Sequence, residues 1–118
     1  LSLIYPYNIV SKKQALKILE NIENKLVREK GVIRYSGDGY YHLNGLEAEW
    51  CFGFPWLAII YRNLGITNKY YYYLQKSFEC LTEDYEMPEL YFGNTNIYNE
   101  NTPLGWGQSL LLVALKEN

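Results

Sequence analysis

The stretch EAEWCFGFPWLAIIYRNL, residues 47–64, decides the fold. Its apolar residues fall on almost every side of a helix, and such a helix has to be buried by other elements. Gly65 follows directly, and glycine commonly ends a helix. Pro55 inside the stretch predicts a helix that either begins later than residue 47 or is kinked. The sequence therefore predicts a central buried helix that ends at Leu64.

Two neighbouring helices are bounded by clear start and stop signals. Ser11 is a good N-cap before apolar residues at helical spacing, and Gly31 stops that pattern. Another helix follows a cap at Thr67 or Asn68 and extends to about residue 81. Because the connection 65–67 is very short, this helix and the central one are predicted to form an antiparallel hairpin.

A last helix is predicted from Thr102 as its cap and Pro103 as its first residue, extending to about residue 115. Two long connections remain, residues 31–45 and 84–101, which are rich in Gly, Asn and Tyr. Long loops on a helical frame commonly carry functional residues. The predicted fold class is all-α.

The composition is that of a globular chain. Of the 118 residues, 48% are hydrophobic and 20% are charged, which excludes a disordered chain and indicates one domain or part of one. The net charge is −2 and only 11 scattered residues are Lys or Arg, so nucleic acid is not an expected partner. No apolar run reaches the roughly 18 residues of a membrane span, so a membrane is not expected either.

Few residues are suited to a metal or to secretion. Cys51 and Cys80 are the only cysteines and His42 the only histidine, so neither a disulfide framework nor a metal site nor a cofactor is expected. Reduced thiols and the lack of a signal-peptide pattern favour a cytoplasmic protein. The chain begins with Leu1, so we expect a further segment upstream.

Aromatic residues make up 17% of the chain, including thirteen Tyr and three Trp. Tyr and Trp combine a flat apolar face with a polar group, which suits either a protein interface or a sugar ring. The central helix is apolar on more faces than a four-helix bundle covers. We therefore expect it to pack against helices outside this chain or against another copy.

Residues in the long loops and at the starts of two predicted helices are candidates for chemistry. In RYSGDG, residues 34–39, Arg34 could donate paired hydrogen bonds to ligand hydroxyls, although an ion pair with Asp38 that staples the loop is favoured. Glu47 and Glu49 begin the predicted central helix, where stabilisation by the helix dipole is a simpler role than catalysis.

The second long loop contains MPELYFG, residues 87–93. Glu89 is flanked by apolar residues and is a candidate general acid or base, with an ordinary surface glutamate as the alternative. Trp106 stands between Gly105 and Gly107, which indicates close approach of a ligand or of another helix.

Taken in chain order, these segments resemble glycoside hydrolase family 15, the glucoamylase-like enzymes, and most closely its branch in the α and β subunits of phosphorylase kinase. The resemblance covers nearly all of residues 1–118, and its most specific parts are PELY at 88–91 and TPLGWGQSL at 102–110. It implies helical hairpins that form the C-terminal part of a six-hairpin α/α toroid. Residues 1–118 would then be a single domain or a fragment of the glucoamylase-like catalytic domain.

The resemblance also implies an activity and site residues. The domain would act on α-linked glucans by inverting hydrolysis, which uses a general acid and a general base, and Glu89 falls at the position of the base. Substrate-binding roles are implied for five further residues: Arg34, Asp38, Glu47, Trp56 and Trp106.

The family's general acid lies in an upstream Trp-Glu segment that this sequence lacks, so we expect the chain alone to be inactive. Its base motif, Pro-Glu-Leu, has the phosphorylase kinase form, which leaves a non-catalytic glucan-binding or regulatory module as an alternative. An oligomerising structural helical domain is a third possibility. The expected partners are an α-glucan or maltooligosaccharide and either the missing N-terminal helices or further copies of the chain.

Overall fold

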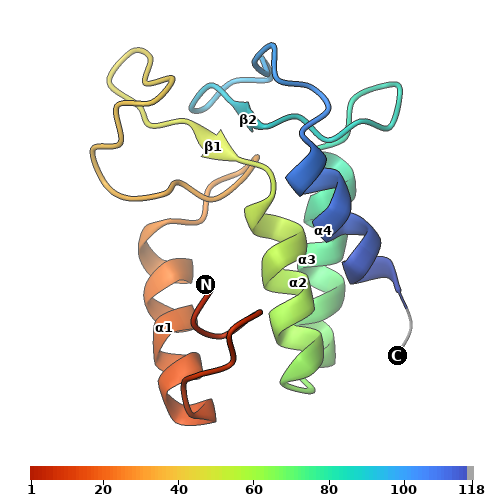
Figure 1. Ribbon diagram of the computed structural model, residues 1–118. Coiled ribbons are helices and arrows are strands. Elements are labelled where there is room, and N and C mark those ends of the chain that lie inside the picture. Colours follow the sequence, from red (N-terminus) through yellow and green to blue (C-terminus); the bar gives the residue numbers. More distant parts are fainter. Residues whose placement is uncertain (117–118) are drawn as a thin grey trace.

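The computed structural model describes residues 1–116 and is mainly helical (Figure 1). Two antiparallel strands of two residues each form a small sheet, in which Glu49 pairs with Tyr91 and Trp50 with Leu90. The elements are α1 (Lys12–Lys25), β1 (Glu49–Trp50), α2 (Gly53–Asn63), α3 (Thr67–Glu79), β2 (Leu90–Tyr91) and α4 (Gly105–Leu115). The helical class is confirmed, whereas the small sheet was not predicted.

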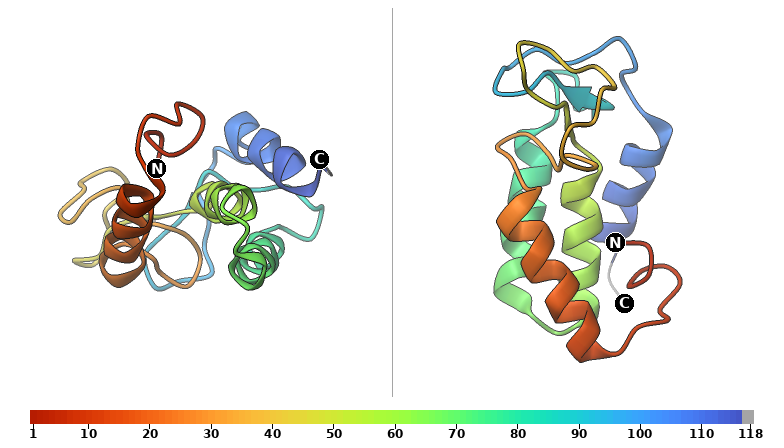
Figure 2. Two further views of the ribbon diagram at one scale, coloured as in Figure 1. Left: turned by 90° about the horizontal axis from the view of Figure 1, so that it is seen from below. Right: turned by 90° about the vertical axis from the view of Figure 1, so that its left-hand side faces the viewer.

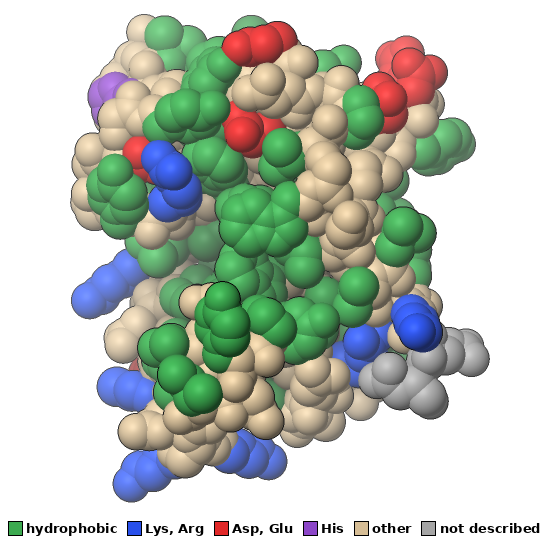
Figure 3. All heavy atoms as spheres, in the orientation of Figure 1, with side chains coloured by type: hydrophobic (Ala, Val, Ile, Leu, Met, Phe, Trp, Pro, Cys, Tyr) green, Lys and Arg blue, Asp and Glu red, His purple; other side chains and the backbone are tan. Residues whose placement is uncertain are grey.

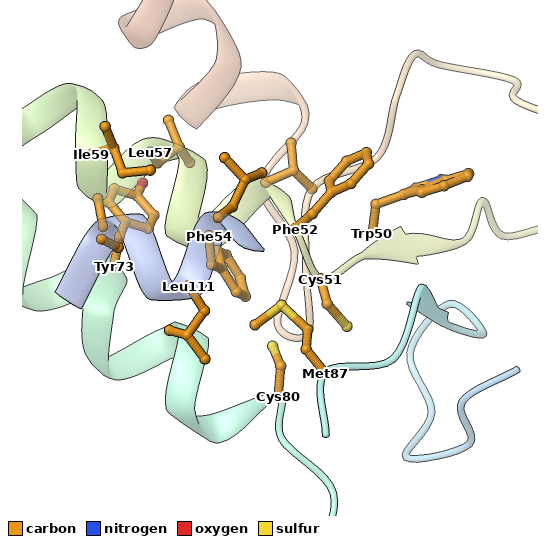
Figure 4. Close-up of a cluster of buried hydrophobic side chains, with 14 of the residues drawn as sticks. Trp50, Cys51, Phe52, Phe54, Leu57, Ile59, Tyr73, Cys80, Met87 and Leu111 are labelled. Carbon is orange, nitrogen blue, oxygen red and sulfur yellow. The ribbon is translucent and has the colours of Figure 1, made fainter. Parts of the chain in front are cut away.

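Helix α2 lies at the centre, as its sequence predicts. It forms a hairpin with α3 through Gly65, whose φ of +75° suits glycine, and α4 packs on its other side (Figure 2). Eight of its eleven residues are buried. Their side chains meet those of α3, α4 and the loop after α3 in one hydrophobic core, around Phe54, Leu57 and Tyr73 (Figure 4).

The central helix begins at Gly53, not at residue 47. Residues 49 and 50 are extended because they pair with β2, so Pro55 falls in the first turn, where it costs no helical hydrogen bond. A later start was one of the two outcomes that Pro55 predicted. The prediction that Glu47 and Glu49 stabilise this helix N-terminus is wrong, since both precede Trp50 in extended or loop backbone.

Ser11 caps α1 as predicted, in a reciprocal pair of hydrogen bonds with Gln14. The helix ends at Lys25, well before Gly31. The other two predicted caps are wrong. Thr67 already lies within α3. Helix α4 begins at Gly105, so Pro103 precedes it, and the Thr102 hydroxyl donates to the carbonyl of Asn99 at 2.9 Å instead of capping the helix.

The long connections after α1 and α3 gather at one end of the helices (Figure 1). The sheet joins them there, since β1 follows the first connection and β2 lies in the second. Cys51 and Cys80 are free thiols and fully buried, as predicted. Within residues 1–116 none of the helices combines the length and the apolar character needed to cross a bilayer.

Candidate functional site

A pocket of about 540 Å³ opens between α1 and the first turns of α2 and α4. Its volume is within the range of small-molecule sites. Apolar side chains gather over this part of the molecule (Figure 3). The lining residues are Leu1, Ile22, Leu26, Val32, Ile33, Arg34, Trp50, Phe52, Gly53, Trp56, Glu89, Leu104 and Trp106.

Aromatic rings form a continuous wall along the pocket. Trp50 stacks on Phe52 with ring centroids 5.3 Å apart, and Phe52 meets Trp106 at 4.4 Å. Trp106 in turn lies 5.5 Å from Trp56. Trp106 is 51% exposed although it is large and apolar, so its face is available to a ligand. The indole N–H of Trp56 donates to the carbonyl of Tyr5 at 2.9 Å, which fixes that ring.

Gly107 explains part of the glycine pattern around Trp106. A Cβ at this position would lie 3.1 Å from the sulfur of Met87, so the backbone of α4 passes close to that side chain. A Cβ at Gly105 would meet nothing within 4 Å. One of the two glycines therefore serves core packing, and the other faces open space.

Arg34 and Asp38 form the predicted loop staple. Nε and Nη2 of Arg34 donate to the two oxygens of Asp38 at 2.6 and 2.8 Å. The hydrogen bonds from Arg34 hold the pKa of Asp38 below its ordinary value, against the effect of its burial. The guanidinium lies 4.6 Å from the Trp50 ring, and within residues 1–116 its Nη1 has no acceptor. Arg34 therefore still has a donor at the rim of the pocket.

Glu89 is the one acidic residue among the described pocket-lining residues. It is 9% exposed, and its Oε1 accepts three hydrogen bonds. The donors are the Asn99 amide at 2.7 Å, the Asn101 amide at 3.1 Å and the Tyr40 hydroxyl at 3.2 Å. Within the described chain no donor reaches Oε2. The carboxylate of Glu89 is therefore fixed by hydrogen bonds to one oxygen, while the other oxygen is free of protein donors in the described chain. Because it is buried, Glu89 is not the ordinary surface glutamate that was the alternative.

Glu47 and Glu49 lie outside the pocket. Glu47 accepts from the backbone N–H of Gly37 at 3.0 Å, which lowers its pKa. Glu49 is 3% exposed and accepts from the backbone N–H groups of Lys30 at 2.8 Å and Asn94 at 2.7 Å. Both carboxylates therefore hold loops together.

The predicted site residues are divided by the fold. The pocket brings together Arg34, Trp56, Glu89 and Trp106, which come from four separate segments. Asp38 does not line the pocket but accepts hydrogen bonds from Arg34, and Glu47 is not among the lining residues.

Sequence reasoning missed Trp50 and Phe52 in the wall and Tyr40, Asn99 and Asn101 around Glu89. No local signal in the sequence indicates these contacts, because Tyr40 and the two asparagines meet Glu89 only through the folded loops.

The described residues contain no group of three His, Cys, Asp or Glu side chains placed to hold a metal ion. The polar groups of the pocket are a carboxylate acceptor, a guanidinium donor and indole rings. Such a set can bind a neutral ligand that carries both hydroxyl groups and an apolar face.

Comparisons with protein-family models, with curated proteins and with solved structures found no match for this chain.

Proposed function

We propose that the aromatic pocket binds a sugar ring of an α-linked glucan, and that the chain is part of a glucoamylase-like glycoside hydrolase domain. The observation that carries this proposal is Glu89, a buried carboxylate with one free oxygen in a pocket walled by Trp50, Phe52, Trp56 and Trp106. Hydroxyl groups of a sugar could donate to Glu89, and its apolar face could lie against the rings.

In an inverting reaction Glu89 would be the general base. It would take a proton from a water molecule as that water attacks the anomeric carbon, while a second carboxylic acid protonates the leaving oxygen. The two carboxyl groups of such enzymes lie about 6.5–9.5 Å apart. Because Glu89 is the single acid among the described lining residues, the second group would have to come from outside the described part of the pocket.

The lone acid also favours the second candidate, a non-catalytic glucan-binding module. Both candidates need the same pocket and differ in whether a general acid completes it. The proposed toroid is supported by the α2–α3 hairpin, because helical hairpins are the units from which such a toroid is built. We place the protein in the cytoplasm on the basis of its two buried free thiols.

The test is a titration of the 118-residue chain with maltotriose, followed by NMR, beside an assay of glucose release. We expect binding without release. Trp106→Ala should weaken binding about tenfold, because it removes an exposed ring of the wall. Leu112→Ala is the matched control, since Leu112 is 68% exposed on the same helix and does not line the pocket.

Absence of maltotriose binding, or equal effects of the two variants, would overturn the sugar-site proposal. Release of glucose by the full gene product, abolished by Glu89→Gln, would favour the hydrolase. Binding without release by the full product would favour the glucan-binding module.

A further inference from the structure

The three hydrogen bonds to the Glu89 side chain all use the same carboxylate oxygen. All of them end on Oε1, and two come from the amides of Asn99 and Asn101. Glutamate has three rotatable side-chain bonds, so two donors on the same oxygen restrict it to one orientation. Asn99 is itself only 3% exposed, which leaves its amide little freedom to turn away.

The backbone places these two amides. The segment 99–101 runs beside 89–90, with the N–H of Glu89 donating to the carbonyl of Asn101 at 3.0 Å and the N–H of Asn99 donating to Leu90 at 3.2 Å. The chain bends at Glu100 between these two backbone contacts, and the amides of Asn99 and Asn101 both reach Oε1 of Glu89. Glu100 points elsewhere and accepts from the hydroxyl of Tyr41.

We propose that Asn99 and Asn101 are the positioning residues of the pocket carboxylate: they occupy Oε1 of Glu89 and thereby direct Oε2 to the bound ligand. This inference rests on the proposed sugar site. An amide N–H donates without carrying charge, so Oε2 keeps its full capacity as an acceptor for a ligand hydroxyl or a water. A positively charged donor at the same place would compete with the ligand for the carboxylate.

The effect of each amide on binding should depend on Glu89. We expect Asn101→Ala to weaken maltotriose binding about tenfold, because a hydrogen bond to a charged group is lost. In the Glu89→Ala background the same change should leave the affinity unchanged. Asn101 is exposed, so its loss is compatible with folding, and thermal denaturation checks this. Asn96→Ala is the matched control, since Asn96 is exposed in the same loop and its side chain makes no hydrogen bond within residues 1–116.

A second measurement does not depend on sugar binding. The side-chain amide signals of Asn99 and Asn101 should shift in Glu89→Ala, whereas that of Asn96 should stay unchanged. If E89A leaves no measurable binding, these signals decide the question.

The outcomes separate the two proposals. Equal loss of affinity from N101A in both backgrounds, or amide signals that do not respond to E89A, would overturn the positioning role. If the wild-type chain binds no maltotriose, the sugar site is wrong, and a shift of both amide signals would still support the positioning of Glu89.

Discussion

Removing the hydroxyl of Tyr73 should destabilise the fold through a single carboxylate. Glu23 of α1 accepts hydrogen bonds from Tyr73 of α3 at 2.6 Å, from Lys69 at 2.6 Å and from Tyr61 of α2. The rings of Tyr61 and Tyr73 are stacked 5.7 Å apart, which holds both hydroxyl groups at the same carboxylate. This cluster ties α1 to the α2–α3 hairpin.

The magnitude follows from the charge and burial of the partners. A hydrogen bond to a charged group contributes about 1.5–3 kcal/mol. Glu23 is 21% exposed and keeps two other donors in Tyr73→Phe, so we expect the lower end, about 1.5 kcal/mol. The phenylalanine ring fills the space of the tyrosine ring, so no cavity adds to this loss.

The effect should depend on pH. Burial raises the pKa of Glu23, but the hydrogen bonds from Lys69, Tyr61 and Tyr73 outweigh it, so the pKa lies below its ordinary value of 4.5. A carboxylate with a lowered pKa stabilises the folded state above the unfolded pKa, and this contribution is lost as the pH falls through the folded pKa. The difference between wild type and Y73F should therefore be full at pH 7 and shrink below pH 4.5.

Urea denaturation followed by circular dichroism measures this difference. Tyr72→Phe is the matched control, because Tyr72 is 53% exposed and its hydroxyl has no hydrogen-bond partner in the described part of the chain. We expect Y72F to stay within about 0.5 kcal/mol of wild type. A Y73F variant as stable as Y72F, or a loss that does not shrink on acidification, would refute the role given to Glu23.

Three further predictions concern the stability of the fold. Gly31→Ala should lower the free energy of unfolding by about 1–3 kcal/mol, since its Cβ would lie 2.4 Å from the carbonyl oxygen of Trp50. Gly105→Ala, whose Cβ would meet nothing within 4 Å, should be neutral or slightly stabilising. Thermal denaturation measures both. Asp38→Asn should lower stability at pH 7 but not in acid, because Arg34 lowers the pKa of Asp38; urea titrations at the two pH values check this. Arg62→Met should lower the free energy of unfolding by about 1–3 kcal/mol, because the Arg62 guanidinium donates to carbonyls at the end of α4. Hydrogen exchange should show faster exchange of the amides there.

The helices could largely be predicted from local sequence, whereas their starting points could not. The apolar pattern of residues 53–64 and Gly65 predict α2 and place its end within one residue, at Leu64 where the structure has Asn63. Its start depends on the pairing of Trp50 with Leu90, forty residues away, which no local pattern contains. Thr102 has the residue type of a cap, but its hydroxyl is bound to the carbonyl of Asn99 instead.

The residues of the candidate site also fall into those that local sequence could predict and those that it could not. Arg34, Glu89 and Trp106 could be found because each stands in an unusual local context, such as a glycine-rich loop or a pair of glycines. The residues that hold Glu89 come from two loops that meet only in the folded chain. Glu47 and Glu49 were assigned to a helix end, and the extended backbone there turns them toward loop N–H groups.

Glu49 has a consequence for how this chain can change in evolution. One carboxylate holds the N–H of Lys30 in the first long loop and that of Asn94 in the second, so the spacing of both loops is set by one side chain. Insertions or deletions next to residues 30 or 94 would break this brace. The turn at Gly45, where an added Cβ would meet nothing within 4 Å, has room for them. Length variation among descendants should therefore concentrate at that turn, away from the two N–H groups that Glu49 binds.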